Sequence, residues 1–241
     1  TADVALAEGE GAHLIAGLDA SRSVDEVFDV LQTRLGRGKF SEVRLGLNKR
    51  TRERVAIKVL HKAGSSAVRI ETEVSVLRAC RQLGHPNLIQ LHDTFESSTE
   101  IHLIFELLPG GTLLELLQRR GGTGLPENIA RTLVKQVLSG LRALHSINVV
   151  HRDLKLDNVL LDANGKPRII DFGFAKRCVD ASPTRFASSP VGTPGFVAPE
   201  VFGGGGYDFA VDMWALGIVA FVLIYAVPPF TERSPPEFHR L

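Results

Sequence analysis

The stretch His151-Arg152-Asp153-Leu154-Lys155-Leu156-Asp157-Asn158, followed by Asp171-Phe172-Gly173, decides how this chain is interpreted. Phosphoryl transfer needs a carboxylate that orients or accepts a hydroxyl proton, ligands for Mg²⁺, and cations for the developing charge. Asp153, Lys155 and Asn158 supply these three types in one short loop, and Asp171 adds a second carboxylate. A charged surface loop is the alternative, and the second carboxylate at short range argues against it.

Two segments upstream are compatible with nucleotide binding. Gly36-Arg37-Gly38-Lys39-Phe40-Ser41-Glu42-Val43 places two glycines between strand-like segments, where a backbone can approach a phosphate closely. Taken alone, this segment is better explained as a β-hairpin turn than as a phosphate-binding loop. Val55-Ala56-Ile57-Lys58 puts a lysine in an apolar strand, which is costly unless the ammonium reaches an anion or faces solvent. After a glycine-rich hairpin, Lys58 becomes a candidate ligand for nucleotide phosphates.

A helix is predicted between these segments and the loop. Ile70, Val74 and Leu77 recur at the spacing of one helix face, and Gly84-His85-Pro86-Asn87 ends the pattern. Glu73 lies on this stripe and is the candidate ion-pair partner for Lys58. A solvated surface charge is the alternative for Glu73, and Glu71 is the competing residue.

The composition is that of an ordinary globular protein. The 241 residues are 44% hydrophobic and 23% charged, with a formal charge of +1, so no polybasic patch for nucleic acid or a membrane surface is indicated. Two cysteines cannot form a disulfide scaffold, which favours a reducing, intracellular and cytoplasmic location. The uncharged run 213–230 has about 18 residues, near the lower limit for a membrane span. Because Gly217, Pro228 and Pro229 interrupt it, we interpret it as a fully buried core helix.

The order of patterns predicts two lobes. Residues 1–27, rich in Ala, Gly, Asp and Ser, are expected to be a flank or linker with a short helix. Residues 28–107 alternate in the manner of strands, with one helix, and 108–241 are mainly helical. Pro126 is placed to start a helix that carries an apolar stripe to about Ser146. The predicted fold class is α+β, with a hinge near 108–111.

The chain resembles the serine/threonine protein kinases. The glycine-rich loop, V-A-I-K, H-R-D-L-K-x-x-N, D-F-G and Ala198-Pro199-Glu200 occur in the order of the protein-kinase signature set, and the resemblance covers about residues 28–240. Lys155 and the segment Gly192-Thr193-Pro194-Gly195-Phe196 are similar to the serine/threonine form. The segments "HPNLIQLHDTF" and "YDFAVDMWALGIVAF" are most similar to the calcium/calmodulin-dependent kinases.

This resemblance implies roles for individual residues. Asp153 would be the catalytic base, Lys155 would support the γ-phosphate, and Thr193 would link both to the substrate loop. Lys58 would bind the α- and β-phosphates, with Glu73 positioning it. Asn158 and Asp171 would bind Mg²⁺. Phe105 would be the gatekeeper, the residue at the back of the adenine pocket. The implied nucleotide-binding residues are Gly36, Arg37, Gly38, Val43, Ala56, Lys58, Glu106, Leu108, Asp157 and Leu160.

The implied function is transfer of the γ-phosphoryl group of ATP to a protein serine or threonine, with a protein substrate and no nucleic-acid or membrane partner. Because Lys58, Asp153, Asn158 and Asp171 are all present, this function is favoured over that of a pseudokinase acting as a binding module. Ser189 lies where relatives often carry an activating phosphate, and Arg152 is the candidate phosphate ligand. The alternative is that Ser189 and its neighbours are simply polar residues of a loop.

Three departures from the family pattern carry expectations. Ser41 replaces the third glycine of the loop, and altered nucleotide affinity is expected. Thr112 stands where many relatives that prefer basic substrates have a substrate-binding glutamate. Glu115 or Asp157 are the residues expected to take over part of the role of that glutamate. The family fold continues past Leu241 and there supplies an arginine partner for Glu200. The second lobe is thus expected to be truncated, with Glu200 semi-buried and unpaired at a cost of about 3 kcal/mol.

Overall fold

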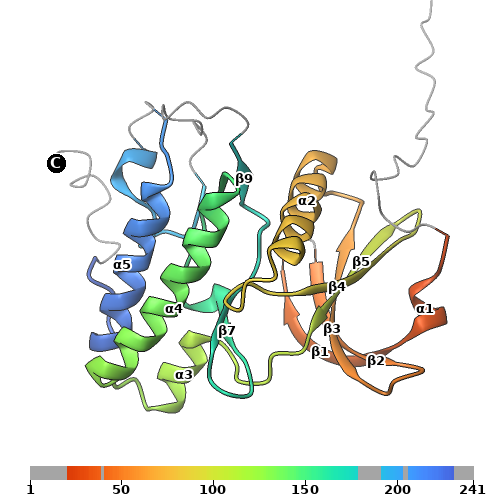
Figure 1. Ribbon diagram of the computed structural model, residues 1–241, viewed down its shortest axis with the longest axis horizontal. Helices are drawn as coiled ribbons and strands as arrows, with labels where there is room; N and C mark the ends of the chain where they lie inside the picture. The colour runs from red at the N-terminus through yellow and green to blue at the C-terminus, as the bar shows by residue number, and fades with distance from the viewer. Residues whose placement is uncertain (1–20, 39–40, 179–190, 203–205, 231–241) are drawn as a thin grey trace, which may run out of the picture. The chain divides into compact units, whose positions relative to one another are not determined.

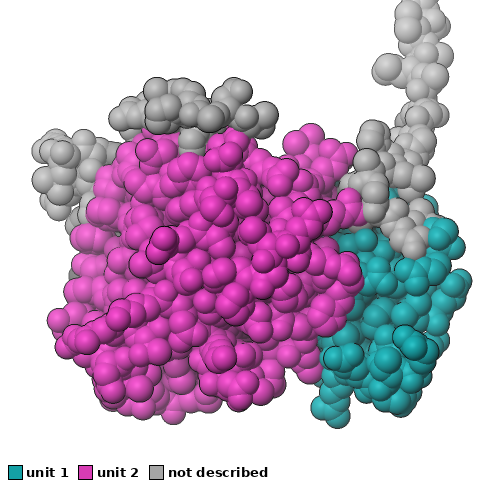
Figure 2. All heavy atoms as spheres, in the orientation of Figure 1, with its two compact units in different colours: residues 1–65, 93–104 teal, residues 66–92, 105–241 magenta. Residues whose placement is uncertain are grey.

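The computed structural model describes residues 21–38, 41–178, 191–202 and 206–230. Its contacts divide the chain into two compact units, coloured separately in Figure 2. Unit 1 comprises Thr1–Ser65 and Asp93–Ile104, and unit 2 comprises Ser66–His92 and Phe105–Leu241. The predicted lobes, 28–107 and 108–241, place the first long helix differently, and they stay a prediction.

Unit 1 is built on a five-stranded sheet with the strand order β1-β2-β3-β5-β4 (Figure 1). β1 pairs with β2 and β2 with β3 in antiparallel register. The strands are β1 (Phe28–Arg37), β2 (Ser41–Asn48), β3 (Arg54–His61), β4 (Leu91–Glu96) and β5 (Glu100–Glu106). The segments 28–36, 42–47, 54–60 and 101–108 have strand-like sequence patterns, which predicted β1, β2, β3 and β5. β4 was missed because His92, Asp93 and Thr94 interrupt its apolar residues, so that only Leu91 and Phe95 mark a buried face.

One face of this sheet carries the core of unit 1. Val55, Ile57 and Val59 alternate along β3 and pack in one buried cluster with Phe95. The helix α1 (Val24–Val27) closes the cluster with Val24, and Ser23 caps it by accepting a hydrogen bond from the Asp25 amide. Alternation then places Ala56 and Lys58 on the opposite face of β3.

Unit 2 contains the longer helices: α2 (Ala67–Leu83), α3 (Leu113–Arg119), α4 (Glu127–Ser146) and α5 (Ala210–Tyr225). The predicted stripes are buried on α2 and α4. The α4 stripe consists of Ala130, Leu133, Val137, Leu141 and Leu144. α4 begins directly after Pro126 and ends at Ser146, as the pattern predicted. α4 and α5 pack side by side (Figure 1).

The prediction that residues 213–230 form a fully buried helix is wrong in its burial. α5 ends at Tyr225, and Met213, Phe221 and Tyr225 are exposed among the described residues. α5 packs against α4 and, through Val211, against a cluster with Val150 and Val201, so its apolar residues are buried only where these neighbours lie. No helix in the described ranges combines the length and apolarity that a membrane crossing requires.

Short elements after α4 arrange the loops of the site. β6 (Val149–Val150) pairs with β9 (Lys176–Arg177), and β7 (Val159–Leu161) pairs with β8 (Pro167–Ile169). The short helices η1 (Leu156–Asn158) and η2 (Pro199–Val201) lie within this region. The segment 151–158 therefore starts and ends at paired strands, which fixes both of its ends.

Candidate active site

The predicted catalytic loop is organised around a buried histidine. His151 has no exposed surface, its Nδ1 accepts a hydrogen bond of 3.2 Å from the Asp153 amide, and its Nε2 lies 3.1 Å from the Ile170 carbonyl. These contacts require a neutral ring with the proton on Nε2. The His151 ring also meets Phe172 edge-on, with centroids 5.5 Å apart. His151 thus joins the loop to the Asp171-Phe172-Gly173 segment.

Asp212 at the start of α5 anchors the same loop, and sequence reasoning missed it. Its carboxylate is fully buried and accepts hydrogen bonds from the amides of His151 and Arg152, both 2.9 Å long. His145 Nε2 lies 2.8 Å from Oδ2. A buried carboxylate that accepts several hydrogen bonds is a strong positional restraint. Its sequence signal was a single acidic residue at the entrance of an apolar run.

Arg152 adopts a left-handed backbone conformation, with φ of 68°. Its Nε donates to the Phe174 carbonyl at 2.7 Å and its Nη1 donates to the Tyr207 hydroxyl at 3.1 Å. The predicted phosphate ligand is therefore engaged with groups of unit 2 itself. Gly192 is required nearby, since a Cβ atom there would lie 2.9 Å from the Arg152 carbonyl oxygen. The predicted phosphosite, Ser189, lies outside the described residues.

Asp153 lies at the centre of a compact set of polar contacts. The Thr193 hydroxyl donates to Asp153 Oδ1 at 2.7 Å and accepts from Lys155 Nζ at 2.7 Å. Lys155 Nζ also lies 3.3 Å from Asp153 Oδ2. Asn158 Nδ2 donates to the Asp153 carbonyl at 2.7 Å and to Oδ2 at 3.0 Å. The structure thus brings together four residues that the sequence analysis selected.

Asp171 and Asn158 are the candidate ligands for a metal ion. Asp171 is exposed, with φ of 61°, and the Ile170 amide beside it donates to the Asn158 carbonyl at 2.9 Å. Since Asn158 Nδ2 points to Asp153, its amide oxygen is the atom that suits a cation. Among the described residues no group of three or more His, Cys, Asp or Glu side chains forms a metal site. Two oxygen ligands fit Mg²⁺, which keeps waters and takes phosphate oxygens as further ligands.

Glu73 is the buried member of the Glu71–Glu73 pair on α2. Its side chain is close to the Asp171 segment: a Cβ atom added at Gly173 would lie 3.6 Å from Glu73 Oε2 and 3.4 Å from Asp171 Oδ1. Arg69, one turn earlier on α2, donates to the Gly173 carbonyl at 3.2 Å. Within unit 2, α2 therefore borders the candidate metal ligands.

The candidate residues of unit 1 lie on β1, β2 and β3. Gly36 pairs with Val43, and Val43 pairs with Lys58, so these three form one row across the sheet. Arg37 ends β1 and is exposed, and the Gly38 amide donates to the Ser41 carbonyl at 2.7 Å. These contacts support the hairpin interpretation, and a role of the segment in covering a nucleotide stays a prediction. Ala56 and Lys58 are half-buried on β3.

The predicted hinge follows β5. Phe105 and Leu108 are buried, and the Gly110 amide donates to the Leu161 carbonyl at 2.9 Å. This contact excludes a side chain at Gly110, because a Cβ atom would lie 2.6 Å from that of Leu161. Leu160, on β7, is half-buried and forms an isolated bridge with Thr112, whereas Asp157 is exposed.

Glu115 and Glu200 carry expectations from the sequence. Glu115 forms a capping box with Thr112 at the start of α3 and its side chain is 54% exposed, so its use as a substitute for the substrate-binding glutamate stays a prediction. Glu200 is exposed rather than semi-buried. An exposed carboxylate keeps much of its hydration, so the expected cost of about 3 kcal/mol, which assumed a semi-buried carboxylate, does not apply to it.

The thiols offer no alternative nucleophile. Burial raises the pKa of Cys80 to about 12, and burial also raises the pKa of Cys178. Both side chains are buried and neither forms a disulfide. Because the thiolate is the reactive form, neither buried cysteine is a candidate nucleophile at neutral pH.

Comparison with known proteins identifies the family of the chain. Residues 30–240 match the protein kinase domain family, so the chain belongs to the protein kinase family. It is similar to Myosin light chain kinase A of Dictyostelium discoideum, with 37% identity over 220 residues, covering 89% of this chain and 72% of the relative.

Two further relatives broaden the comparison. Calcium/calmodulin-dependent protein kinase type 1B of Homo sapiens is 37% identical over 223 residues, covering 90% of this chain and 62% of the relative. CBL-interacting serine/threonine-protein kinase 20 of Arabidopsis thaliana is 38% identical over 211 residues, covering 86% and 47%. The predicted kinase fold, the serine/threonine class and the likeness to calmodulin-dependent kinases are confirmed. The chain spans between 47% and 72% of the length of these relatives.

Proposed function

We propose that this chain transfers the γ-phosphoryl group of ATP to a serine or threonine hydroxyl of a protein. The observation that carries the proposal is the contact set in which Asp153 lies within hydrogen-bonding or ion-pair distance of Thr193, Lys155 and Asn158. A carboxylate held in this way has one defined orientation toward an incoming hydroxyl.

In the proposed reaction, the substrate oxygen forms a bond to the γ-phosphorus as the bond to the bridging oxygen of ADP breaks. Asp153 accepts the hydroxyl proton, and Lys155 stabilises the negative charge on the transferred group. Thr193 hydrogen-bonds to both Asp153 and Lys155 and keeps the two side chains in a fixed relative position. Lys58 of unit 1 binds the α- and β-phosphates, and Glu73 positions it.

Asn158 and Asp171 are the residues proposed to hold Mg²⁺, which supplies charge neutralisation on the phosphates when bound. Gly36, Arg37, Gly38 and Val43 are proposed to cover the nucleotide. The backbone of Glu106 and Leu108 is proposed to bind the base, with Ala56 and Leu160 packing against it, and Asp157 is proposed to lie beside the nucleotide. The two lobes, 28–107 and 108–241, with the flank 1–27, are the proposed domain organisation.

The test is an ATP-dependent phosphorylation assay on a serine/threonine peptide library. We expect Asp171→Asn to reduce the signal by about 100-fold or more, because it weakens metal binding at the phosphates. Asp29→Asn is the matched control, since Asp29 is a half-buried carboxylate of unit 1 whose ion-pair contacts to Lys49 and Arg52 are both 3.7 Å long. Equal signals from wild type and Asp171→Asn would contradict the mechanism. ATP binding without transfer by wild type would favour a binding module.

A further inference from the structure

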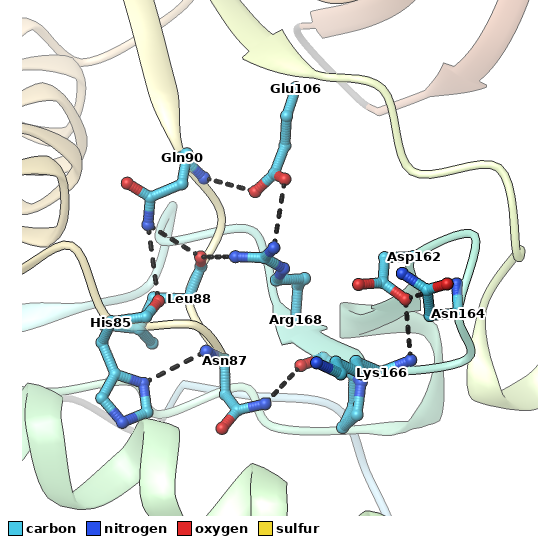
Figure 3. A network of polar contacts seen from close by, with 10 residues as sticks. His85, Asn87, Leu88, Gln90, Glu106, Asp162, Asn164, Lys166 and Arg168 are labelled. Carbon is cyan, nitrogen blue, oxygen red and sulfur yellow. Dashed lines mark hydrogen bonds and ion pairs between the residues drawn. The ribbon is translucent and has the colours of Figure 1, made fainter.

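The side chain of Glu106, at the end of β5, is held by two other segments of unit 2 (Figure 3). Its Oε1 accepts a hydrogen bond of 3.0 Å from the Gln90 amide, and its Oε2 lies 3.5 Å from Arg168 Nη2. Arg168 Nη1 donates to the Leu88 carbonyl at 3.5 Å. The Glu106 amide donates in turn to the Gln90 carbonyl at 3.3 Å. We refer to Gln90, Glu106 and Arg168 as the hinge clamp.

The hinge clamp is shielded from solvent. The side chains of Arg168 and Glu106 are 18% and 20% exposed. Arg168 Nε is buried and has no hydrogen-bond partner among the described residues. The guanidinium therefore depends on Glu106 for compensation of its charge, and removing one partner leaves the other partly desolvated. Such a pair differs from an exposed ion pair, which contributes little.

The segments that hold Glu106 are themselves joined to one another. Asn87 Nδ2 donates to the Pro167 carbonyl at 2.9 Å, and the Ile169 amide donates to the Asn87 carbonyl at 2.9 Å. The Ile89 amide donates to the Ile169 carbonyl at 3.0 Å, and Leu88 bridges Ile169 in parallel register. The loop after α2 thus extends the β7–β8 hairpin, and Arg168 projects from this hairpin toward Glu106.

This arrangement makes the side chain of Glu106 a restraint on its own backbone. One main-chain contact at this point is the 3.3 Å hydrogen bond from the Glu106 amide to the Gln90 carbonyl. The carboxylate adds two contacts to groups that are fixed by β8 and the loop. Holding the side chain at both oxygens limits rotation of the peptide groups that follow Glu106.

We propose that Arg168, acting through Glu106, is a positioning residue for the backbone groups that bind the nucleotide base. This inference rests on the proposed function, in which Glu106 and Leu108 present main-chain groups to the base. The position of the base-binding segment then depends on Arg168, a side chain on β8 that touches no substrate. Loss of the clamp then weakens nucleotide binding and leaves the Asp153 contacts in place.

The experiment compares Arg168→Met, Glu106→Gln and the double variant with the wild-type chain. Arg168→Met keeps the bulk of the side chain and removes its charge, and Glu106→Gln keeps an acceptor for the Gln90 amide. For each single variant we expect KM for ATP and the Kd of a fluorescent ATP analogue to rise about five- to tenfold, with kcat within about twofold. The double variant should be no worse than the weaker-binding single variant, because both break one interaction.

Two controls separate positioning from a general effect on folding. Arg168→Lys keeps the charge and should restore part of the ATP affinity. Arg131→Met breaks the ion pair between Arg131 and Glu127, whose side chains are 60% and 71% exposed, and should leave both constants unchanged. Thermal midpoints measured for all variants show whether the fold is retained, and Glu106→Gln is the mildest change if Arg168→Met fails to fold.

The outcomes that would overturn the inference are distinct. If KM and Kd for ATP stay unchanged while the thermal midpoint falls, the clamp contributes to stability only and does not position the base site. A higher kcat with unchanged KM would mean that the clamp restrains a motion rather than positioning the base site. Failure of the wild-type chain to bind or use ATP would refute the proposed function and this inference with it. Normal ATP use by wild type and Arg168→Met alike would refute the inference alone.

Discussion

The hydroxyl of Thr193 donates a hydrogen bond of 2.7 Å to Asp153 Oδ1 and accepts one of 2.7 Å from Lys155 Nζ. One side chain thereby spaces a carboxylate and an ammonium that carry opposite charges. Lys155 Nζ and Asp153 Oδ2 lie 3.3 Å apart, so the hydroxyl of Thr193 helps to fix the relative position of the two groups to which the proposal gives catalytic roles.

Thr193→Val keeps the shape of the side chain and removes the hydroxyl. We expect kcat to fall about 10- to 100-fold, because both groups lose their alignment, with KM for ATP changed little. Thr193→Ser restores the hydroxyl and should recover most of the rate. Steady-state kinetics on one peptide substrate measure this, and a Thr193→Val enzyme with wild-type kcat would contradict the assigned role.

Asp212→Asn places an amide against the backbone N–H groups of His151 and Arg152. At least one buried donor then loses its acceptor, and we expect a loss of about 2–4 kcal/mol in the free energy of unfolding. Urea denaturation measures the change. Asp29→Asn, on a carboxylate whose side chain is 43% exposed, should shift the same free energy by less than about 0.5 kcal/mol. Equal shifts would show that Asp212 is not an anchor.

The pH dependence of stability should contain a contribution from His85. Burial, and then the charge of Arg168, lower the pKa of His85 from its ordinary value of 6.5. Its Nδ1 accepts a hydrogen bond of 3.1 Å from the Asn87 amide, which protonation of Nδ1 would break. Because the folded pKa is lowered, the unfolded chain binds more protons below pH 6.5. This contribution is thus present above pH 6.5 and is lost as the pH falls toward the lowered pKa.

Urea midpoints measured between about pH 5 and pH 8 test this contribution, and His85→Gln should flatten the acid side of the profile. Arg168→Met provides a second check, since removing its positive charge should raise the pKa of His85 in an NMR titration. A pKa of His85 that stays the same in this variant would argue against proximity of the two charges.

The cysteines should resist alkylation in the folded chain. Since burial raises the pKa of Cys80 to about 12, almost no thiolate exists at neutral pH. We expect iodoacetamide to label Cys80 only at the rate at which the chain opens, and rapidly in urea. Mass spectrometry after timed labelling measures the rate. Fast labelling in buffer at the same rate as in urea would contradict the burial of Cys80.

The strands and helices with a clear period were predictable from local pattern. The stripe from Ala130 to Leu144 predicted α4 with both ends correct, because Pro126 and a continuous apolar face are signals contained in the segment itself. β4 was not predictable in this way, since its polar centre carries no alternation. The burial of α5 also could not be inferred, because composition reports apolarity and not which neighbours are present.

By itself, the sequence determined which chemical groups exist and their order: a lysine in an apolar strand, a loop with Asp153, Lys155 and Asn158, and a second carboxylate at Asp171. These follow from residue type and short spacing. Tertiary structure alone decided that Asp212 accepts hydrogen bonds from a loop 60 residues earlier, that Glu106 meets Arg168, and that Glu200 is exposed. Such contacts depend on how distant segments pack, and a local pattern carries no information about which distant partner a buried polar group acquires.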